Sequence, residues 1–217
     1  MKSVAILAFL FGVTASAADA ATMVEFSGNE NPALATGSAL ISLDAGGNSI
    51  TGTLTNTSPF DARITAFGFN IGPGNLGGFT GTPDPITTPL GVDFDFQDGD
   101  LGTVPQFNPV VLDFGYLTGS NFGGGSPNDG LDNGAMLQFV VSGPFTGLTE
   151  EQIAAGLFVR FQRVGLDDGS DVATTGDGSP GVPTPFDTTP IPEPATMVLL
   201  GGGLVYLARR RVNSRRI

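Results

Sequence analysis

The chain has 217 residues, a formal net charge of −12, and no histidine, cysteine or tryptophan. Without histidine and cysteine, it cannot form a Ser-His-Asp or Cys-His nucleophile system, an imidazole-bound metal site or a disulfide. We therefore expect no enzyme, and an acidic surface that repels phosphates predicts no nucleic-acid partner.

The N-terminal residues have the pattern of a secretory signal peptide. Lys2 is followed by an apolar run from Val4 to Val13 and then by the small-residue sequence Ala18-Asp19-Ala20. A positive start, a short apolar core and a small-x-small site together favour export through the Sec machinery. We predict a signal peptide over 1–20, with Ala17 as an alternative last residue.

The body of the chain is more acidic than the whole. Residues 21–190 contain 19 carboxylates, no lysine and three arginines (Arg63, Arg160 and Arg163), which is a net charge near −16. Such a surface attracts divalent cations or basic partners. On one segment, Arg160 and Arg163 flank Phe161, where they would pair with internal carboxylates or recognise an acidic glycan.

Short stretches of alternating apolar and polar residues predict half-buried strands. Hairpins and loops are indicated by Gly, Pro, Asn and Asp between them, for example Asp44-Ala45-Gly46-Gly47-Asn48. In the segment 64–71 the alternation places Thr65 on the same face as Phe67 and Phe69. The expected strand segments are 38–44, 49–56, 64–71, 110–114, 137–141 and 157–161.

One helix is predicted, because Thr149-Glu150-Glu151-Gln152 has the spacing of a capping box. Many short strands and one helix predict an all-β fold, a single antiparallel β-sandwich of the jelly-roll or immunoglobulin-like kind. We place this domain at 21–173. Three Gly- and Pro-rich stretches, 72–89, 118–134 and 167–190, predict irregular structure, and residues 174–190 predict an extended linker.

Clusters of aspartate suggest calcium (Ca²⁺) as a cofactor, since hard oxygen ligands in turns are what this ion prefers. The densest cluster consists of Asp93, Asp95, Asp98 and Asp100. The segments 128–133 and 167–171 are further candidates. The alternative is that Asp and Gly form turns and solubilise the surface. Asn56-Thr57-Ser58 also fits a glycosylation sequon.

The C-terminal residues 191–217 combine three features in a fixed order. Prolines at 190, 192 and 194 keep the backbone extended, so no helix can continue backward through them. The apolar run from Met197 to Ala208 would span about 18 Å as a helix, against about 30 Å of hydrocarbon. Arginines follow it and favour a cytoplasmic end. The run contains Met197, Val198, Leu199, Leu200, Leu204, Val205 and Leu207, and the basic stop contains Arg209, Arg210 and Arg211.

Ile191-Pro192-Glu193-Pro194-Ala195-Thr196, the short apolar run and the arginines resemble the PEP-CTERM sorting signal of Gram-negative bacteria. The resemblance covers about 27 of the 217 residues. It implies export, transient retention in the inner membrane, and recognition of Pro192, Glu193 and Pro194 by an exosortase, a membrane-embedded cysteine transpeptidase. It also implies delivery to the cell surface or to extracellular polysaccharide. An ordinary C-terminal anchor that stays in place is the alternative.

These observations lead to two main functional hypotheses, and a glycan hydrolase that works with carboxylates alone is a third. The first is a non-enzymatic exported protein of the surface or extracellular matrix, associated with exopolysaccharide or biofilm and cleaved at its PEP motif. The second is a carbohydrate-binding β-sandwich assisted by calcium. The lack of tryptophan weighs against the second hypothesis, because glycan-binding platforms usually present exposed Trp or Tyr.

Overall fold

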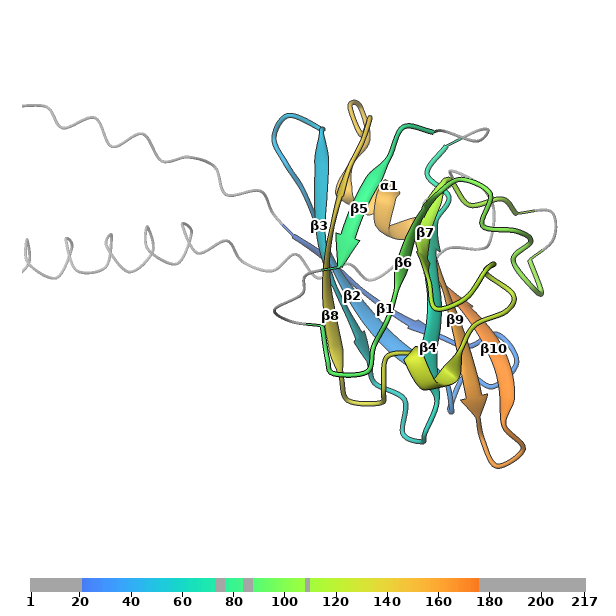
Figure 1. Ribbon diagram of the computed structural model, residues 1–217. Helices are drawn as coiled ribbons and strands as arrows, with labels where there is room; N and C mark the ends of the chain where they lie inside the picture. Colours follow the sequence, from blue (N-terminus) through green and yellow to red (C-terminus); the bar gives the residue numbers. More distant parts are fainter. Residues whose placement is uncertain (1–20, 73–76, 84–87, 108–109, 176–217) are drawn as a thin grey trace, which may run out of the picture. The chain divides into compact units, whose positions relative to one another are not determined.

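The computed structural model describes residues 21–72, 77–83, 88–107 and 110–175, which form two antiparallel five-stranded sheets (Figure 1). The predicted all-β sandwich with one short α-helix is confirmed in this part of the chain. Sheet A has the strand order β1-β2-β3-β8-β5. Its strands are β1 Thr22–Ser27, β2 Thr36–Leu43, β3 Ser49–Asn56, β8 Met136–Ser142 and β5 Thr80–Pro83.

Sheet B has the strand order β10-β9-β4-β7-β6 and packs with its inner face toward sheet A. Its strands are β10 Gly169–Thr174, β9 Leu157–Val164, β4 Arg63–Phe69, β7 Phe114–Leu117 and β6 Asp95–Asp98. The remaining elements are the 3₁₀ turn η1 Pro127–Asp129 and the helix α1 Glu150–Ala155.

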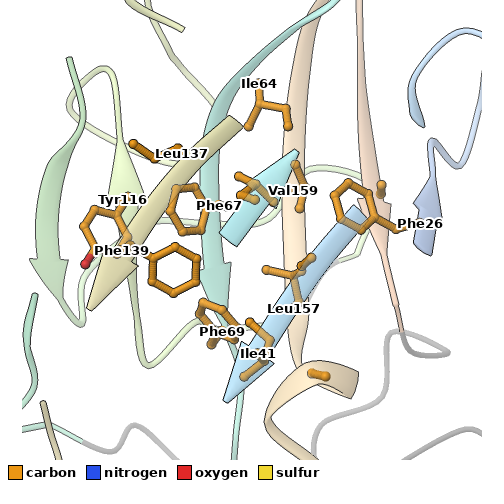
Figure 2. Packing of buried hydrophobic residues seen from close by; sticks show 14 of the residues in the cluster. Phe26, Ile41, Ile64, Phe67, Phe69, Tyr116, Leu137, Phe139, Leu157 and Val159 are labelled. Carbon is orange, nitrogen blue, oxygen red and sulfur yellow. The ribbon is translucent and has the colours of Figure 1, made fainter. Parts of the chain in front are cut away.

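Phenylalanine dominates the core between the two sheets (Figure 2). The ring of Phe67 lies 5.1 Å from that of Phe139 on the opposite sheet and 4.8 Å from that of Tyr116. The Tyr116 hydroxyl crosses to sheet A and donates to the Val140 carbonyl at 3.0 Å. Burial raises the pKa of the Tyr116 phenol, so the group stays a donor.

Two predicted local structures have the expected geometry. Asp44 begins the β2–β3 hairpin, and its carboxylate accepts the backbone N–H groups of Gly46, Asn48 and Ser49. The bond from Ser49 contributes most to lowering the pKa of this carboxyl. Helix α1 begins at a complete capping box, because Thr149 and Gln152 each accept the other's backbone N–H through a side chain.

A second apolar cluster covers the outer face of sheet B. Leu101, Val104, Leu112 and Phe122 pack there against the outward side chains of the strands, including Phe158. The alternating Val110, Leu112 and Phe114 predict a strand, but only Phe114 lies in one, and that strand is β7. The prediction was wrong because the alternating side chains of this segment, Val110 and Leu112, pack on the outer face of sheet B, while its backbone does not pair in a sheet.

Strands also lie in two of the stretches predicted to be irregular. Strand β5 lies within 72–89, and strand β10 lies within 167–190. Both are end strands of their sheets, where a strand pairs on one side and where proline and glycine are tolerated. In the third stretch, 118–134, the regular structure is η1 alone.

Candidate functional site

The four aspartates of the first candidate calcium site lie on and beside strand β6. Asp93 and Asp95 are exposed, while Phe94 and Phe96 point toward the core, as the alternation predicts. The Asp98 carboxylate accepts the N–H groups of Gly78 at 3.0 Å and Phe79 at 3.2 Å. It therefore fixes the neighbouring loop.

The structure does not bring Asp93, Asp95, Asp98 and Asp100 together into one cluster. Among the described residues, which include all four, no group of three or more acidic side chains is arranged to hold a metal ion. The physical reason is the alternation of the strand, which places Asp93 and Asp95 on one side of β6 and Asp98 on the other. The N–H groups of Gly78 and Phe79 hold Asp98 there.

Arginine holds the second candidate segment, 128–133. Arg63 contacts the Asp132 carboxylate at 2.6 Å and donates to the Pro127 carbonyl. Arg163 donates to the Asn128 side chain at 2.7 Å. Arg63 and Arg163 therefore both brace this loop, and the internal partner of Arg163 is an amide and not a carboxylate.

The third candidate segment contains a fully buried carboxylate, Asp171. It accepts hydrogen bonds from the backbone N–H groups of Asn29, Glu30 and Asn31. It also accepts one from the backbone N–H of the next residue, Val172. These bonds join the loop after β1 to strand β10. The carboxylate has a structural role there and is not free to bind a metal.

Arg160 lies on the outward side of strand β9 and is largely buried. It donates to the Ser170 hydroxyl at 2.9 Å, and its Nε atom has no hydrogen-bond partner. Burial lowers the pKa of the guanidinium, and the charges of Asp171 and Glu30 oppose that shift. The position of Arg160 favours an internal role over glycan recognition.

Asn56 of the sequon is fully buried, and its side-chain amide donates to the carbonyls of Ala62 and Leu131. A glycan attached to this nitrogen would have to break both bonds and leave through the core. The sequon is therefore a structural feature of the β3–β4 connection.

The outer face of sheet A carries two depressions that sequence reasoning missed. One has a volume of about 490 Å³ and lies beside strands β1 and β2, where it is lined by Glu25, Ser27, Thr36 and Ser38 among others. The other, of about 220 Å³, lies across β2, β3 and β8, with Leu40, Thr51, Thr53 and Gln138 in its lining. The available signal was the Ser and Thr at positions 36, 38 and 42 and at positions 49, 51, 53 and 55.

The predicted signal peptide, linker, sorting motif, apolar run and basic stop lie outside the described residues, apart from the linker's first two positions, Thr174 and Thr175. Within the described part of the chain, no helix is both long enough and apolar enough to cross a membrane.

Comparison with known proteins gives one result, at the C-terminal end. Residues 190–212 match the family model of the PEP-CTERM protein-sorting motif. The matched range contains Pro192-Glu193-Pro194, the whole apolar run and Arg209–Arg211. No curated protein and no solved structure matches the chain. The chain thus carries the PEP-CTERM sorting motif, which marks it as an exported protein sorted through an exosortase.

Proposed function

We propose that this chain is a non-enzymatic protein of the cell surface or extracellular matrix, associated there with exopolysaccharide. It leaves the cytoplasm through the Sec machinery, is held transiently in the inner membrane, and is cleaved at its PEP motif by an exosortase. The observation that carries this proposal is the family match over residues 190–212. The apolar run is too short for a comfortable permanent span, which supports transient retention.

The described domain supports a role without catalysis. Its two depressions on sheet A contain one titratable group, Glu25, and otherwise hydroxyls, an amide and apolar side chains. General acid–base work needs a positioned donor or acceptor with a tuned pKa, and hydrolysis of glycosides needs two carboxylates. Among the described residues, neither depression offers a second carboxylate.

The second candidate is a carbohydrate-binding sandwich, and the hydroxyl-rich depressions of sheet A favour it. The two candidates are compatible, since a matrix protein needs a ligand in the matrix. Assistance by calcium does not form part of this proposal, because the candidate carboxylates are not gathered into a metal site.

A single substitution tests the sorting proposal. Replacing Glu193 by Ala removes the one charged residue of the motif while leaving the described domain untouched. We expect the Glu193→Ala chain to accumulate in the membrane fraction, uncleaved, while the wild type is released to the surface. Glu151→Ala, at an exposed carboxylate of helix α1, is the matched control and should be sorted normally. Equal release of wild type and Glu193→Ala would contradict the proposal.

A further inference from the structure

The outer face of sheet A is an open array of small hydroxyl side chains. Strands β2, β3 and β8 lie side by side in it, and their outward residues stand in cross-strand ranks. One rank contains Ser42, Thr51 and Val140, and the next contains Leu40, Thr53 and Gln138. The ranks repeat about every 6.6 Å along the strands, and neighbouring strands lie about 4.8 Å apart.

This face is almost free of charge in a strongly acidic domain. Among the outward side chains of the five described strands, Glu25 is the one carboxylate, and there is no arginine. The other carboxylates in the described part of the chain lie in loops, in η1, on helix α1 and on sheet B. The charged side chains that would attract a basic ligand or repel an acidic one therefore lie mostly elsewhere on the domain.

Both depressions described above lie on this one face, at successive positions along strand β2. The larger begins at Thr36 and Ser38 and extends to the edge of the sheet, where Thr174 of β10 also lines it. The smaller lies at Leu40 and Ser42. Thr36 and Ser42 are separated by about 20 Å along the strand. A ligand that fills both depressions is thus an extended one, with repeating units.

We propose that the outer face of sheet A binds an uncharged polysaccharide. Serine and threonine hydroxyls both donate and accept hydrogen bonds, as sugar hydroxyls do, and the Glu25 carboxylate is an acceptor for them. Leu40 and Val140 provide apolar contact for the C–H faces of sugar rings. Because β-branched threonines on a paired strand have few rotamers, little side-chain entropy is lost on binding. Many weak contacts along a polymer replace the aromatic platform that this chain lacks.

A second copy of the chain is the competing occupant. Interfaces between identical copies are enriched in apolar area. This face has four exposed or half-exposed apolar side chains, Met23, Leu40, Met136 and Val140, dispersed among hydroxyls. Its chemistry therefore favours the hydroxylated polymer, and self-association is an outcome of the test.

The ligand class rests on the proposed function, because an exported protein meets extracellular polymers. The experiment uses the full chain, purified from membranes in a polyoxyethylene detergent that contains no sugar. Mobility in native gels is measured with and without hydroxyethyl cellulose, dextran, soluble starch and galactomannan, all of them uncharged. Carboxymethyl cellulose, which has the same backbone as the first polymer but is anionic, is the charge control. Sorting plays no part in this assay, so its failure and a failure of the Glu193→Ala test are distinguishable.

We expect at least one uncharged polymer to retard the wild type and carboxymethyl cellulose not to. Thr51→Val with Thr53→Val, which removes two hydroxyls at nearly constant shape, should weaken binding about tenfold or more. Gln138→Ala, at an exposed position of β8, should also weaken it. The matched control, Thr103→Val with Ser120→Ala, changes exposed hydroxyls in loops outside sheet A and should bind as wild type does. Circular dichroism and melting temperature verify folding.

Three results would overturn the proposal. The first is no retardation of the wild type by any of the four uncharged polymers. The second is equal binding by the sheet A variants and the wild type. The third is a dimer in sedimentation velocity that the sheet A substitutions dissociate without any polymer effect, which would assign the face to a second copy.

Discussion

Asp171 is the residue on which the closure of the sandwich depends most directly. Its carboxylate is fully buried and accepts four backbone N–H groups, three of them from the loop that follows β1. The same loop approaches so closely that a β-carbon on Gly28 would clash with the carboxylate. A glycine and an aspartate 143 positions apart are therefore matched in shape.

We predict that Asp171→Asn destabilises the domain by about 2–3 kcal/mol, because an amide nitrogen then faces buried N–H donors. The free energy of unfolding from chemical denaturation measures this loss. Asp167→Asn, four residues earlier at an exposed position of the β9–β10 turn, should change it by less than about 0.5 kcal/mol. Equal effects of the two substitutions would show that the loop is held by other contacts.

At the scale of elements, the sequence predicts a strand most accurately where one face of that strand is buried and the other face is exposed to solvent. Strands β2, β3 and β8 have this alternation and lie where it indicates. Strand β9 lies where its sequence alternation predicts, but it is buried on both faces, because the second apolar cluster covers its outward side. Strand β4 departs from the alternation, because a bulge between Ile64 and Ala66 changes the phase. Ile64 therefore joins the main core, and Thr65, expected beside Phe67, does not.

Sequence reasoning missed strand β1, although its residues alternate. The other strands that it missed have a common physical cause. Strands β5 and β6 have four residues each, too few to show a period, and β10 begins inside a Gly- and Asp-rich turn. The candidate metal ligands are not gathered into a cluster, for a related reason. Aspartate in turns satisfies backbone N–H groups, and composition alone does not distinguish this use from ligation. The carboxylates of Asp44, Asp98 and Asp171 all accept backbone N–H groups.

The segment that covers sheet B gives a prediction of its own. Leu112 is fully buried in the second cluster, while its neighbour Val111 is 48% exposed. Leu112→Ala should lower the free energy of unfolding by about 2–5 kcal/mol through lost burial and a residual cavity. Val111→Ala should change it by less than about 1 kcal/mol. If the two losses were alike in denaturant titrations, the segment would be an ordinary surface loop.

For the whole molecule, the main question is how so acidic a domain stays folded. Its described carboxylates are used by backbone N–H groups and by arginine at several places, and no group of three or more of them there can hold a metal ion. Calcium should therefore act on the domain only as a general screening ion.

We predict that the melting temperature of the full chain is the same in excess EGTA and in millimolar calcium, when sodium chloride equalises the ionic strength. A ligand stabilises a fold only by binding the folded state better than the unfolded one, and the structure offers no such site in its described residues. A saturable rise in melting temperature that calcium causes and sodium does not would restore calcium as a cofactor.

The two side edges of the sandwich determine whether copies of this chain can pair with one another at high density. At one side β1 and β10 meet through the Gly28–Ala173 bridge, and at the other β5 lies against β6 (Figure 1). An end strand whose backbone N–H and C=O groups are unpaired can pair with a strand of another chain. Such pairing is a common first step of aggregation in β-sheet proteins. Here each end strand lies against the end strand of the other sheet. Copies packed densely together would therefore stay separate molecules, although residues 21–190 contain no lysine, the residue that most often protects such edges.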